Sequence, residues 1–466
     1  MRAQPTLRWV LTESDNLSSP KNSIRVGTGA GFSDDRFEPA ADLALRGKLD
    51  YLVFECLAER TIARETLSRL KNPDAGYTPY LVERFQAVLP ACSRNGIRIV
   101  TNMGAANPAG AARAVRREAK SLGLGDIPVA VVTGDDVADI VRRNPQLPLM
   151  ESGEPVESLL PRMASANAYL GADVICEALK TGAPVVMTGR VADPSLFVGC
   201  MLHGLNWSYD DYGKLAMATV TGHQMECAAQ LTGGCFIDPG KKDAADAVNI
   251  GFPYADIGAD GSVVLGKLED TGGRLDVMTC TEQVLYEMHD PSSYITPDCI
   301  LDIRDVEFAQ ESEHRVRVTG AKARPRTPTY KVVVGFHDGY IGEGEVGYAG
   351  PNALARAQLA EKIVKERLRM RGFTYPEMRV DYIGMSSLHG MGKGRPEPYE
   401  VRLRIAARSP DRKAAQAVGF EVRTLHVNGP SGGGGGSNAL REVLAVKSIL
   451  IPRELVQPAV AVEGTL

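Results

Sequence analysis

Between residues 22 and 240 the sequence repeats one pattern: a short apolar run, a turn of small and polar residues, and then a stretch with helical spacing. Continuous apolar runs are typical of strands that are covered on both faces. Strands that alternate with helices favour βαβ units and therefore an α/β fold with a doubly wound, mostly parallel sheet. We predict strands at Ser23–Val26, Tyr51–Phe54, Ile97–Thr101, Val129–Val132, Val174–Cys176 and Val185–Met187.

The pattern changes near residue 245, where loops and longer alternating segments replace the repeat. We therefore predict two lobes: a Rossmann-like α/β lobe over residues 1–245 and an α+β lobe over residues 246–466. The second lobe has the order β-α-β-β-α-β in outline, a split βαβ (ferredoxin-like) pattern, with a C-terminal Gly-rich loop and helix after it. The Asp338-Gly339 pair favours a hairpin turn between the first two strands of this pattern. The expected elements are the hairpin of Tyr330–Phe336 and Tyr340–Val346, helix Pro351–Met370, strands Arg379–Ile383 and Tyr399–Ala406, helix Asp411–Phe420, strand Arg423–Val427 and helix Asn438–Ile449.

The charge of the chain limits its partners. Its 466 residues include 53 basic and 57 acidic side chains, a net charge of −4, whereas nucleic-acid-binding proteins usually carry a basic face. No run of 18 apolar residues suggests a membrane span, and Met1–Leu17 lacks the apolar core of a signal peptide. We therefore expect a cytoplasmic protein that binds a small molecule and neither nucleic acid nor a membrane.

The eight cysteines form no Cys-x-x-Cys pair. A structural zinc site requires paired ligand spacing, so we expect no metal site of that kind. Because the chain carries no export signal, most of these cysteines are predicted to be buried thiols.

Polar residues stand where the predicted strands of the first lobe end. In an open parallel sheet, ligands bind outside the carboxyl ends of the strands. Glu55 has two interpretations there: a general base with a raised pKa, or a carboxylate paired with Arg60 or another arginine. Asn102 is predicted to donate to a substrate carbonyl, and Arg190 to clamp a carboxylate or phosphate through two hydrogen bonds.

His223 and Glu226 stand three residues apart, so a helix would place them on one face. We predict that they form an acid/base pair; the alternatives are two metal ligands or a satisfied histidine–glutamate hydrogen bond. Asn107 and Asp193 each precede a proline that suits the first turn of a helix. Both residues are therefore expected to cap a helix N-terminus by default. Ligand binding is the second role that we consider for them.

A glycine-rich segment follows the first predicted strand and is a candidate anion site, because backbone N–H groups at a helix N-terminus attract negative charge. It contains Gly27, Gly29 and Gly31. The third glycine of the dinucleotide-binding fingerprint falls at Phe32, so that fingerprint fails. The alternative is a tight turn with a helix N-cap at Ser33.

A second glycine run, Gly432–Gly436, precedes the predicted last helix. Gly432, Gly433 and Gly434 are the expected contacts if the run binds an anion at the helix N-terminus. The alternative is a flexible linker.

Taken together in their order and spacing, six segments resemble the acyclic terpene utilisation (AtuA-like) family. The resemblance extends from about residue 22 to about residue 450. It implies a place beside enzymes that degrade citronellol and geraniol through CoA thioesters, but it supplies no catalytic residues to transfer. The segments are Ile24–Phe32, Asp50–Thr61, Ile97–Pro108, Thr188–Ser195, Gly222–Gly234 and Tyr330–Gly350.

These observations favour a metabolic enzyme of carboxylic acid or acyl-CoA catabolism that performs an acid/base addition–elimination, as a hydratase or another lyase does. No redox-cofactor fingerprint, zinc motif or Gly-x-Ser-x-Gly elbow is present, so we identify no cofactor; a CoA thioester is a possible substrate. One alternative is a thioester or ester hydrolase that uses Cys56, a serine or an activated water as nucleophile. Another is a non-catalytic acyl-CoA-binding subunit of a larger complex. For a metabolic enzyme of this size we expect a homo-oligomer.

Overall fold

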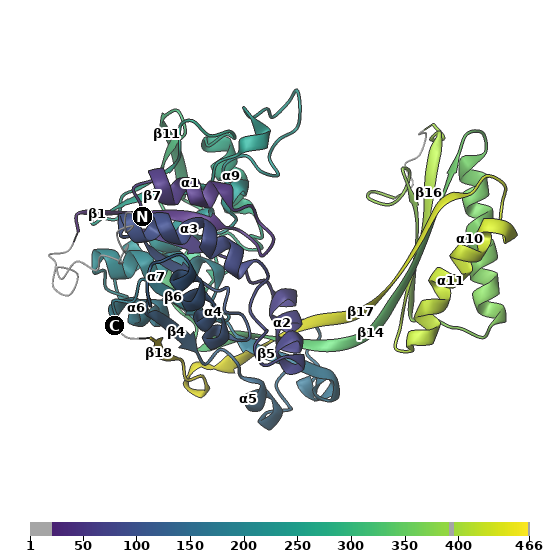
Figure 1. Ribbon diagram of the computed structural model, residues 1–466, viewed down its shortest axis with the longest axis horizontal. Helices are drawn as coiled ribbons and strands as arrows, with labels where there is room; N and C mark the ends of the chain where they lie inside the picture. The colour runs from purple at the N-terminus through teal and green to yellow at the C-terminus, as the bar shows by residue number, and fades with distance from the viewer. Residues whose placement is uncertain (1–20, 391–395, 465–466) are drawn as a thin grey trace, which may run out of the picture. The chain divides into compact units, whose positions relative to one another are not determined.

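The computed structural model describes residues 21–390 and 396–464. The segment Met1–Leu17, on which the signal-peptide prediction depends, lies outside these residues. The chain divides into two compact units: unit 1, Met1–Gly335 with Val446–Leu466, and unit 2, Phe336–Ala445 (Figure 1). The lobe boundary predicted near residue 245 lies inside unit 1. Both units combine helices with sheets, so the prediction of a mixed α/β fold is confirmed.

Unit 1 is built on a ten-stranded sheet with the strand order β11-β12-β8-β7-β1-β2-β3-β6-β4-β18. Strands β1, β2, β3, β6 and β4 run parallel, and antiparallel strands extend the sheet on both sides of them. The parallel strands β2 and β6 are buried along their whole length, because strands of this kind are covered on both faces. The bounds are β1 Ser23–Ala30, β2 Tyr51–Phe54, β3 Arg98–Thr101, β4 Val129–Thr133, β6 Val185–Thr188, β7 Pro253–Gly258, β8 Val263–Lys267, β11 Glu307–Ser312, β12 Arg315–Thr319 and β18 Ala459–Glu463.

Helices and a small second sheet complete unit 1. Helices α1, α3 and α4 bury apolar side chains in one core with the central strands. The helices are α1 Glu38–Arg46, α2 Glu59–Lys71, α3 Leu81–Asn95, α4 Pro108–Ser121, α5 Ala138–Arg143, α7 Asp193–Leu205, α8 Tyr212–Met225 and α9 Val277–Leu285. The small sheet contains β9 Tyr294–Ile295, β10 Cys299–Asp302 and β13 Lys322–Pro325.

The strand predicted at Val174–Cys176 is wrong, because these residues belong to helix α6, Ala172–Lys180. Val174, Ile175, Ala178 and Leu179 are its buried side chains, a spacing that matches one face of a helix. The sequence reading also missed strand β5, Met163–Ala168, which pairs with β14 outside the main sheet.

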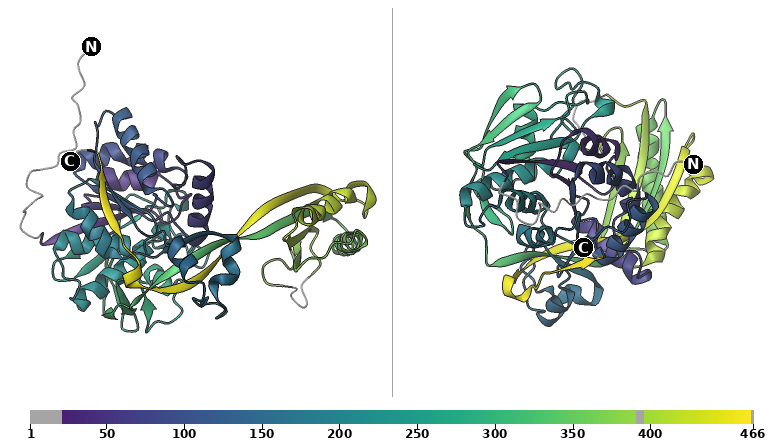
Figure 2. Two further views of the ribbon diagram at one scale, coloured as in Figure 1. Left: turned by 90° about the horizontal axis from the view of Figure 1, so that it is seen from below. Right: turned by 60° about the vertical axis from the view of Figure 1, so that its left-hand side comes forward.

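Unit 2 contains an antiparallel sheet with the strand order β15-β16-β14-β17 and two helices that pack on each other and on β16. The helices lie side by side in Figure 1 and Figure 2. Their inward-facing alanine, valine and leucine side chains join those of β14 and β16 in a separate apolar core. In chain order the elements are β14 Thr329–Ala349, α10 Ala353–Met370, β15 Glu377–Ile383, β16 Glu400–Ser409, α11 Arg412–Asn428 and β17 Gly434–Pro452, of which β14 and β17 continue into unit 1.

The predicted hairpin around Gly339 is wrong, because β14 is one continuous strand of 21 residues. Its two halves have different partners: β5 pairs with it in unit 1, and β16 pairs with Tyr340–Ala349 in unit 2. Gly339 keeps a left-handed backbone with φ of 80° within the strand. The turn residues therefore produce a local irregularity where the two halves take different partners.

Two further predicted elements at the C-terminal end are wrong. The strand expected at Arg423–Val427 belongs to α11, where Val418, Val422 and Leu425 continue a buried helical face. The helix expected at Asn438–Ile449 belongs to strand β17, which adds to the edge of the sheet beside β14. A short apolar stretch is compatible with the residue spacing of either a helix or a strand. In both segments, the element against which the stretch packs decided which of the two forms.

Candidate active site

Three of the predicted residues meet at the carboxyl ends of neighbouring parallel strands. Glu55 follows β2, Asn102 follows β3, and Arg190 stands two residues beyond β6. Asn102 Nδ2 donates to Glu55 Oε1 at 3.0 Å, and the backbone N–H of Leu57 donates to the same oxygen at 2.8 Å. Asn102 is fully buried, and its Oδ1 accepts from the Cys56 backbone N–H at 2.7 Å. Asn102 therefore orients the Glu55 carboxyl group.

Glu55 has the properties of a proton-transfer group. Its side chain is buried, with a residue exposure of 7%. Burial, together with the negative charge of Asp193, raises the pKa of Glu55 to about 8, although Arg190 and the two hydrogen bonds oppose the shift. The carboxyl group is therefore mostly protonated at neutral pH.

Arg190 is 1% exposed and has donors to spare. Its guanidinium carbon lies 4.1 Å from the centre of the Tyr169 ring, and its Nη1 lies 3.2 Å from Asp193 Oδ1 without hydrogen-bond geometry. Among the described residues, Nε and Nη1 have no hydrogen-bond partner. Since a buried guanidinium is costly to leave unsatisfied, these donors mark a position for an anionic ligand.

The Tyr169 ring holds Arg190 in place and links it to a second ion pair. The Tyr169 hydroxyl donates to Glu59, and Lys331 lies over the same ring at 4.9 Å. Lys331 Nζ is 3.7 Å from Glu59 Oε1. Burial raises the pKa of Glu59, but Arg190 and the Tyr169 hydroxyl outweigh it and hold the pKa at about 2. Sequence reasoning missed Tyr169, because the segment before α6 was not predicted as a strand.

Asp135 fixes the backbone of the Arg190 loop. Its Oδ2 accepts from the Arg190 backbone N–H at 2.8 Å and from Asn167 Nδ2 at 3.0 Å. Burial raises the pKa of Asp135 to about 6 despite these hydrogen bonds. The residue follows β4, so a further strand end contributes to the site.

His223 and Glu226 lie in contact at the end of α8, as their spacing predicts. His223 Nδ1 lies 2.8 Å from Glu226 Oε1, and His223 Nε2 lies 3.3 Å from the Val284 carbonyl oxygen. Burial raises the pKa of Glu226 to about 7, although His223 opposes the shift. Burial lowers the pKa of His223, but the Glu226 charge outweighs it and the net pKa is raised. The Asp193 charge raises the pKa of both Glu226 and Glu55, so the pair belongs to the same electrostatic cluster.

The first glycine segment does not form the predicted turn, because Gly27 and Gly29 lie inside strand β1. A Cβ at Gly27 would lie 2.6 Å from the Leu49 side chain, and one at Gly29 would overlap the Phe54 ring. These glycines make room for neighbouring side chains of the core. Gly31 donates its N–H to Asp35 Oδ2 at 2.9 Å, so this amide already has an anionic partner.

The cap and linker residues have structural roles. Asn107 caps α4, as predicted: its Oδ1 accepts from the Gly110 N–H at 3.0 Å, and its Nδ2 donates to two carbonyl groups. Asp193 is not an N-cap, because α7 is capped at Ala192 and the Asp193 carboxylate pairs with Arg190. Gly432 lies in a turn of unit 2 with Ser431, Gly433 follows it, and Gly434 begins strand β17, so no helix N-terminus follows the run.

No metal centre is found among the described residues, where no group of three or more His, Cys, Asp or Glu side chains is placed to hold an ion. All eight cysteines are free, and five of them are buried: Cys56, Cys92, Cys200, Cys280 and Cys299. Burial raises the pKa of the Cys56 thiol well above its usual range. A protonated, buried thiol is a poor nucleophile, so this environment does not favour the role that we considered for Cys56.

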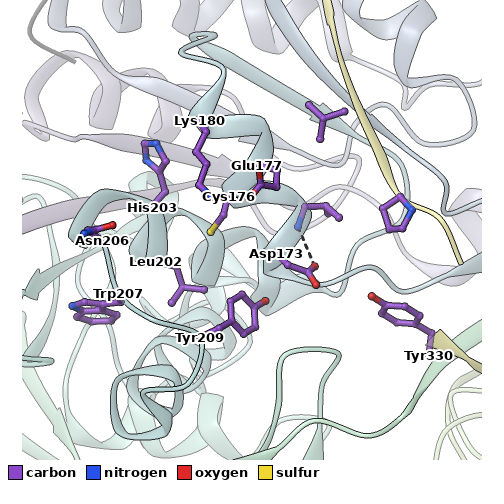
Figure 3. A pocket seen from close by; sticks show the side chains of 13 residues that line it. Asp173, Cys176, Glu177, Lys180, Leu202, His203, Asn206, Trp207, Tyr209 and Tyr330 are labelled. Atoms are coloured by element: carbon purple, nitrogen blue, oxygen red, sulfur yellow. Dashed lines mark hydrogen bonds and ion pairs between the residues drawn. The ribbon is translucent and has the colours of Figure 1, made fainter. Parts of the chain in front are cut away.

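A separate cavity of about 770 Å³ lies along α6 and the end of α7 in unit 1 (Figure 3). Its lining includes Trp207, Tyr209 and Tyr330, but none of the residues predicted for the site. The charged side chains beside it are paired with each other, Lys180 with Glu177 at 2.6 Å and Asp173 with Arg326 at 3.0 Å. The cavity therefore lacks the unsatisfied groups that distinguish the cluster around Glu55.

Among residues 21–390 and 396–464, no helix is both long and apolar enough to cross a membrane. A family model described as acyclic terpene utilisation family protein AtuA matches residues 24–462. No curated protein matches the chain.

Proposed function

This chain belongs to the acyclic terpene utilisation family AtuA, and we propose that it is an enzyme that transfers protons in an addition–elimination step of carboxylic acid or acyl-CoA catabolism. Hydration of an unsaturated acyl group and dehydration of a hydroxyacyl group are such steps. The observation that carries the proposal is Glu55, a buried carboxyl group with a pKa of about 8 beside a guanidinium with free donors. A group with this pKa can exchange a proton with substrate near neutral pH.

In the dehydration direction, the ionised Glu55 carboxylate removes a proton from the carbon next to the acyl carbonyl. The electron pair of that C–H bond forms the C=C bond, and the bond to the leaving hydroxyl breaks. The His223–Glu226 pair donates the proton that it shares to the hydroxyl, which leaves as water. The hydration direction reverses each transfer, so Glu55 then acts as the acid and the His223–Glu226 pair as the base that activates water.

Two other residues assist these transfers. Arg190 pairs with the negative charge of the substrate, for which its buried Nε and Nη1 are available. Asn102, which we predicted to polarise a carbonyl, is fully engaged with Glu55 and Cys56, and its contribution is to position the base.

Proton transfer can be tested before the substrate is known. The protein is incubated in D₂O with a panel of unsaturated and β-hydroxy carboxylic acids and their CoA thioesters, and NMR follows deuterium incorporation and water addition. We expect exchange or hydration with at least one member, and loss of both in Glu55→Gln. A protein that binds a thioester without exchange would be a binding subunit. Hydrolysis of the thioester without exchange would support the hydrolase alternative.

A further inference from the structure

Arg84 is a second buried arginine that has donors without hydrogen-bond partners among the described residues. It stands in the first turns of α3 and is 1% exposed. Its Nη2 donates to the carbonyl oxygens of Ser33 at 2.7 Å and Asp35 at 3.0 Å. Within the described part of the chain, Nε and Nη1 have no hydrogen-bond partner. The Asp35 carboxylate interacts with Arg84 through its charge, but it accepts its hydrogen bonds from the backbone N–H groups of Gly31 and Arg36. Burial of a charge in this state is costly unless something else satisfies it.

The environment of Arg84 repeats that of Arg190. Each guanidinium lies over an aromatic ring, Phe37 at 5.1 Å for Arg84 and Tyr169 at 4.1 Å for Arg190. In each, Nε and Nη1 have no hydrogen-bond partner among the described residues, although the Asp193 carboxylate lies 3.2 Å from Arg190 Nη1.

Arg25 shows what a satisfied arginine of this protein looks like. It lies over the Tyr254 ring at 4.2 Å, but its Nε and Nη2 donate to both oxygens of Asp256, at 2.6 Å and 3.0 Å, and its Nη1 donates to the Gly47 carbonyl. Stacking on a ring therefore does not by itself leave the donors of an arginine free.

Arg84 lies at the same edge of the sheet as the acid/base residues. The loop that it holds, with Ser33 and Asp35, follows the carboxyl end of β1, the strand beside β2. The charges of both Arg84 and Glu55 act on the thiol of Cys56, the residue after Glu55. Along the strand order β1-β2-β3-β6, Arg84 stands on the β1 side of Glu55 and Arg190 on the β6 side.

We propose that Arg84 is a second anion-binding residue of this site, and that the substrate carries two anionic groups, as a dicarboxylate does. One group pairs with Arg190 and the other with Arg84, and the reacting carbon lies between them at Glu55. The inference rests on the proposed function for the location of the reacting carbon. The two arginines themselves are defined independently of it.

The test compares short dicarboxylates, succinate, glutarate and adipate, with their monomethyl esters at constant ionic strength, by isothermal titration calorimetry. We expect the wild type to bind one dicarboxylate about tenfold or more tightly than its monoester, because a hydrogen bond to a charged group contributes that much. Arg84→Gln is expected to abolish this preference and to leave monoester binding intact. Arg190→Gln should weaken both ligands.

Two variants keep the test informative. Arg25→Gln is the matched control, since it removes an equally stacked arginine whose donors are already paired, and it should keep the preference. If Arg84→Gln unfolds, Arg84→Lys retains the charge but not the planar donor geometry, and it should reduce the preference. An unchanged preference in the folded Arg84 variants, or no preference in the wild type, would overturn the proposal.

Binding of these dicarboxylates and proton exchange on the unsaturated and β-hydroxy acids separate this inference from the proposed function. Glu55→Gln should bind the dicarboxylates and fail to exchange protons on those acids. Discrimination between one and two anionic groups without any proton exchange would retain the two-anion site and reject the enzyme. Proton exchange on monoanions alone would retain the enzyme and reject the two-anion site.

Discussion

Unit 1 and unit 2 both gather charged side chains, but the surroundings of those charges differ. On the sheet of unit 2, Arg404 pairs with Asp381 at 2.9 Å and also with Glu343. On the same sheet, Arg402 pairs with Glu345 at 3.3 Å. Asp381 is buried, but the other side chains of these pairs are partly exposed, and each cation faces a carboxylate on a neighbouring strand.

In unit 1, the charges at the carboxyl ends of the strands are buried and incompletely satisfied. Arg190 and Arg84 keep donors without partners, and Glu55 and Glu226 have raised pKa values. Exposed, mutually paired charges stabilise a fold only slightly. Buried, unsatisfied charges oppose folding, and they are expected where a ligand or a proton completes them.

Among the substitutions that compare the two units, Glu55→Gln in unit 1 should cause the largest loss of activity. Loss of the proton-transfer group is expected to lower kcat/KM by about 10²–10⁴-fold, the usual contribution of general acid–base catalysis. The fold should persist, because glutamine resembles the protonated carboxyl group present at neutral pH. Proton exchange and thermal unfolding measure the two effects. Glu345→Gln in unit 2 is the control. If the two variants had equal activities, the buried charges of unit 1 would not differ in function from the paired charges of unit 2.

Glu226→Gln should have a smaller effect, a loss in rate of about 10²-fold, because Glu226 acts through His223. The pH–rate profile of proton abstraction separates the groups. The rate should rise as the pH passes about 8, where Glu55 ionises, and a second change of slope near pH 7 should disappear in Glu226→Gln. A wild-type profile that is flat between pH 6 and 9 would contradict the assignment.

Stability should depend on the protonation of Glu55. Its folded-state pKa of about 8 exceeds the value near 4.3 of an unfolded chain, so the folded state binds the proton more tightly. The free energy of unfolding should therefore decrease as the pH rises from about 4 to about 8, by a few kcal/mol. Urea unfolding at several pH values measures the slope. Glu55→Gln should make the slope smaller, whereas Glu345→Gln should not; Glu226 and Asp135, whose pKa values are also raised, account for the part that remains.

Arg402→Ala in unit 2 should have the smallest effect. The pair with Glu345 is partly exposed, with Arg402 side-chain exposure of 48%, so its removal should cost about 1 kcal/mol or less. Proton exchange should be unchanged. A much larger loss of stability, or any loss of activity, would show that the charged sheet of unit 2 is more than a solvated surface.

The sequence predicted which polar residues would lie close together better than it predicted their surroundings. Glu55, Asn102 and Arg190 follow apolar strands, and parallel topology brings such strand ends together whatever the details of packing. The spacing of His223 and Glu226 likewise predicted their contact. Tyr169 and Arg84 were missed, because no local pattern indicates which ring a distant arginine will contact.

The errors in the fold have a common cause. Gly27 and Gly29 read as a loop because glycine is frequent in turns, but here they admit Leu49 and Phe54 to the sheet. The segments Val174–Cys176, Arg423–Val427 and Asn438–Ile449 are short apolar stretches that suit either period. In each, the neighbouring element decided between helix and strand.

By itself the sequence determined the alternating strands and helices of unit 1, its family and the strand ends that carry the polar groups, since these follow from local composition and chain order. Only the tertiary structure decided which charges are buried, which are paired and which are left without partners. Burial and pairing depend on residues far apart in the chain, and they set the pKa of Glu55 and the free donors of Arg190 and Arg84.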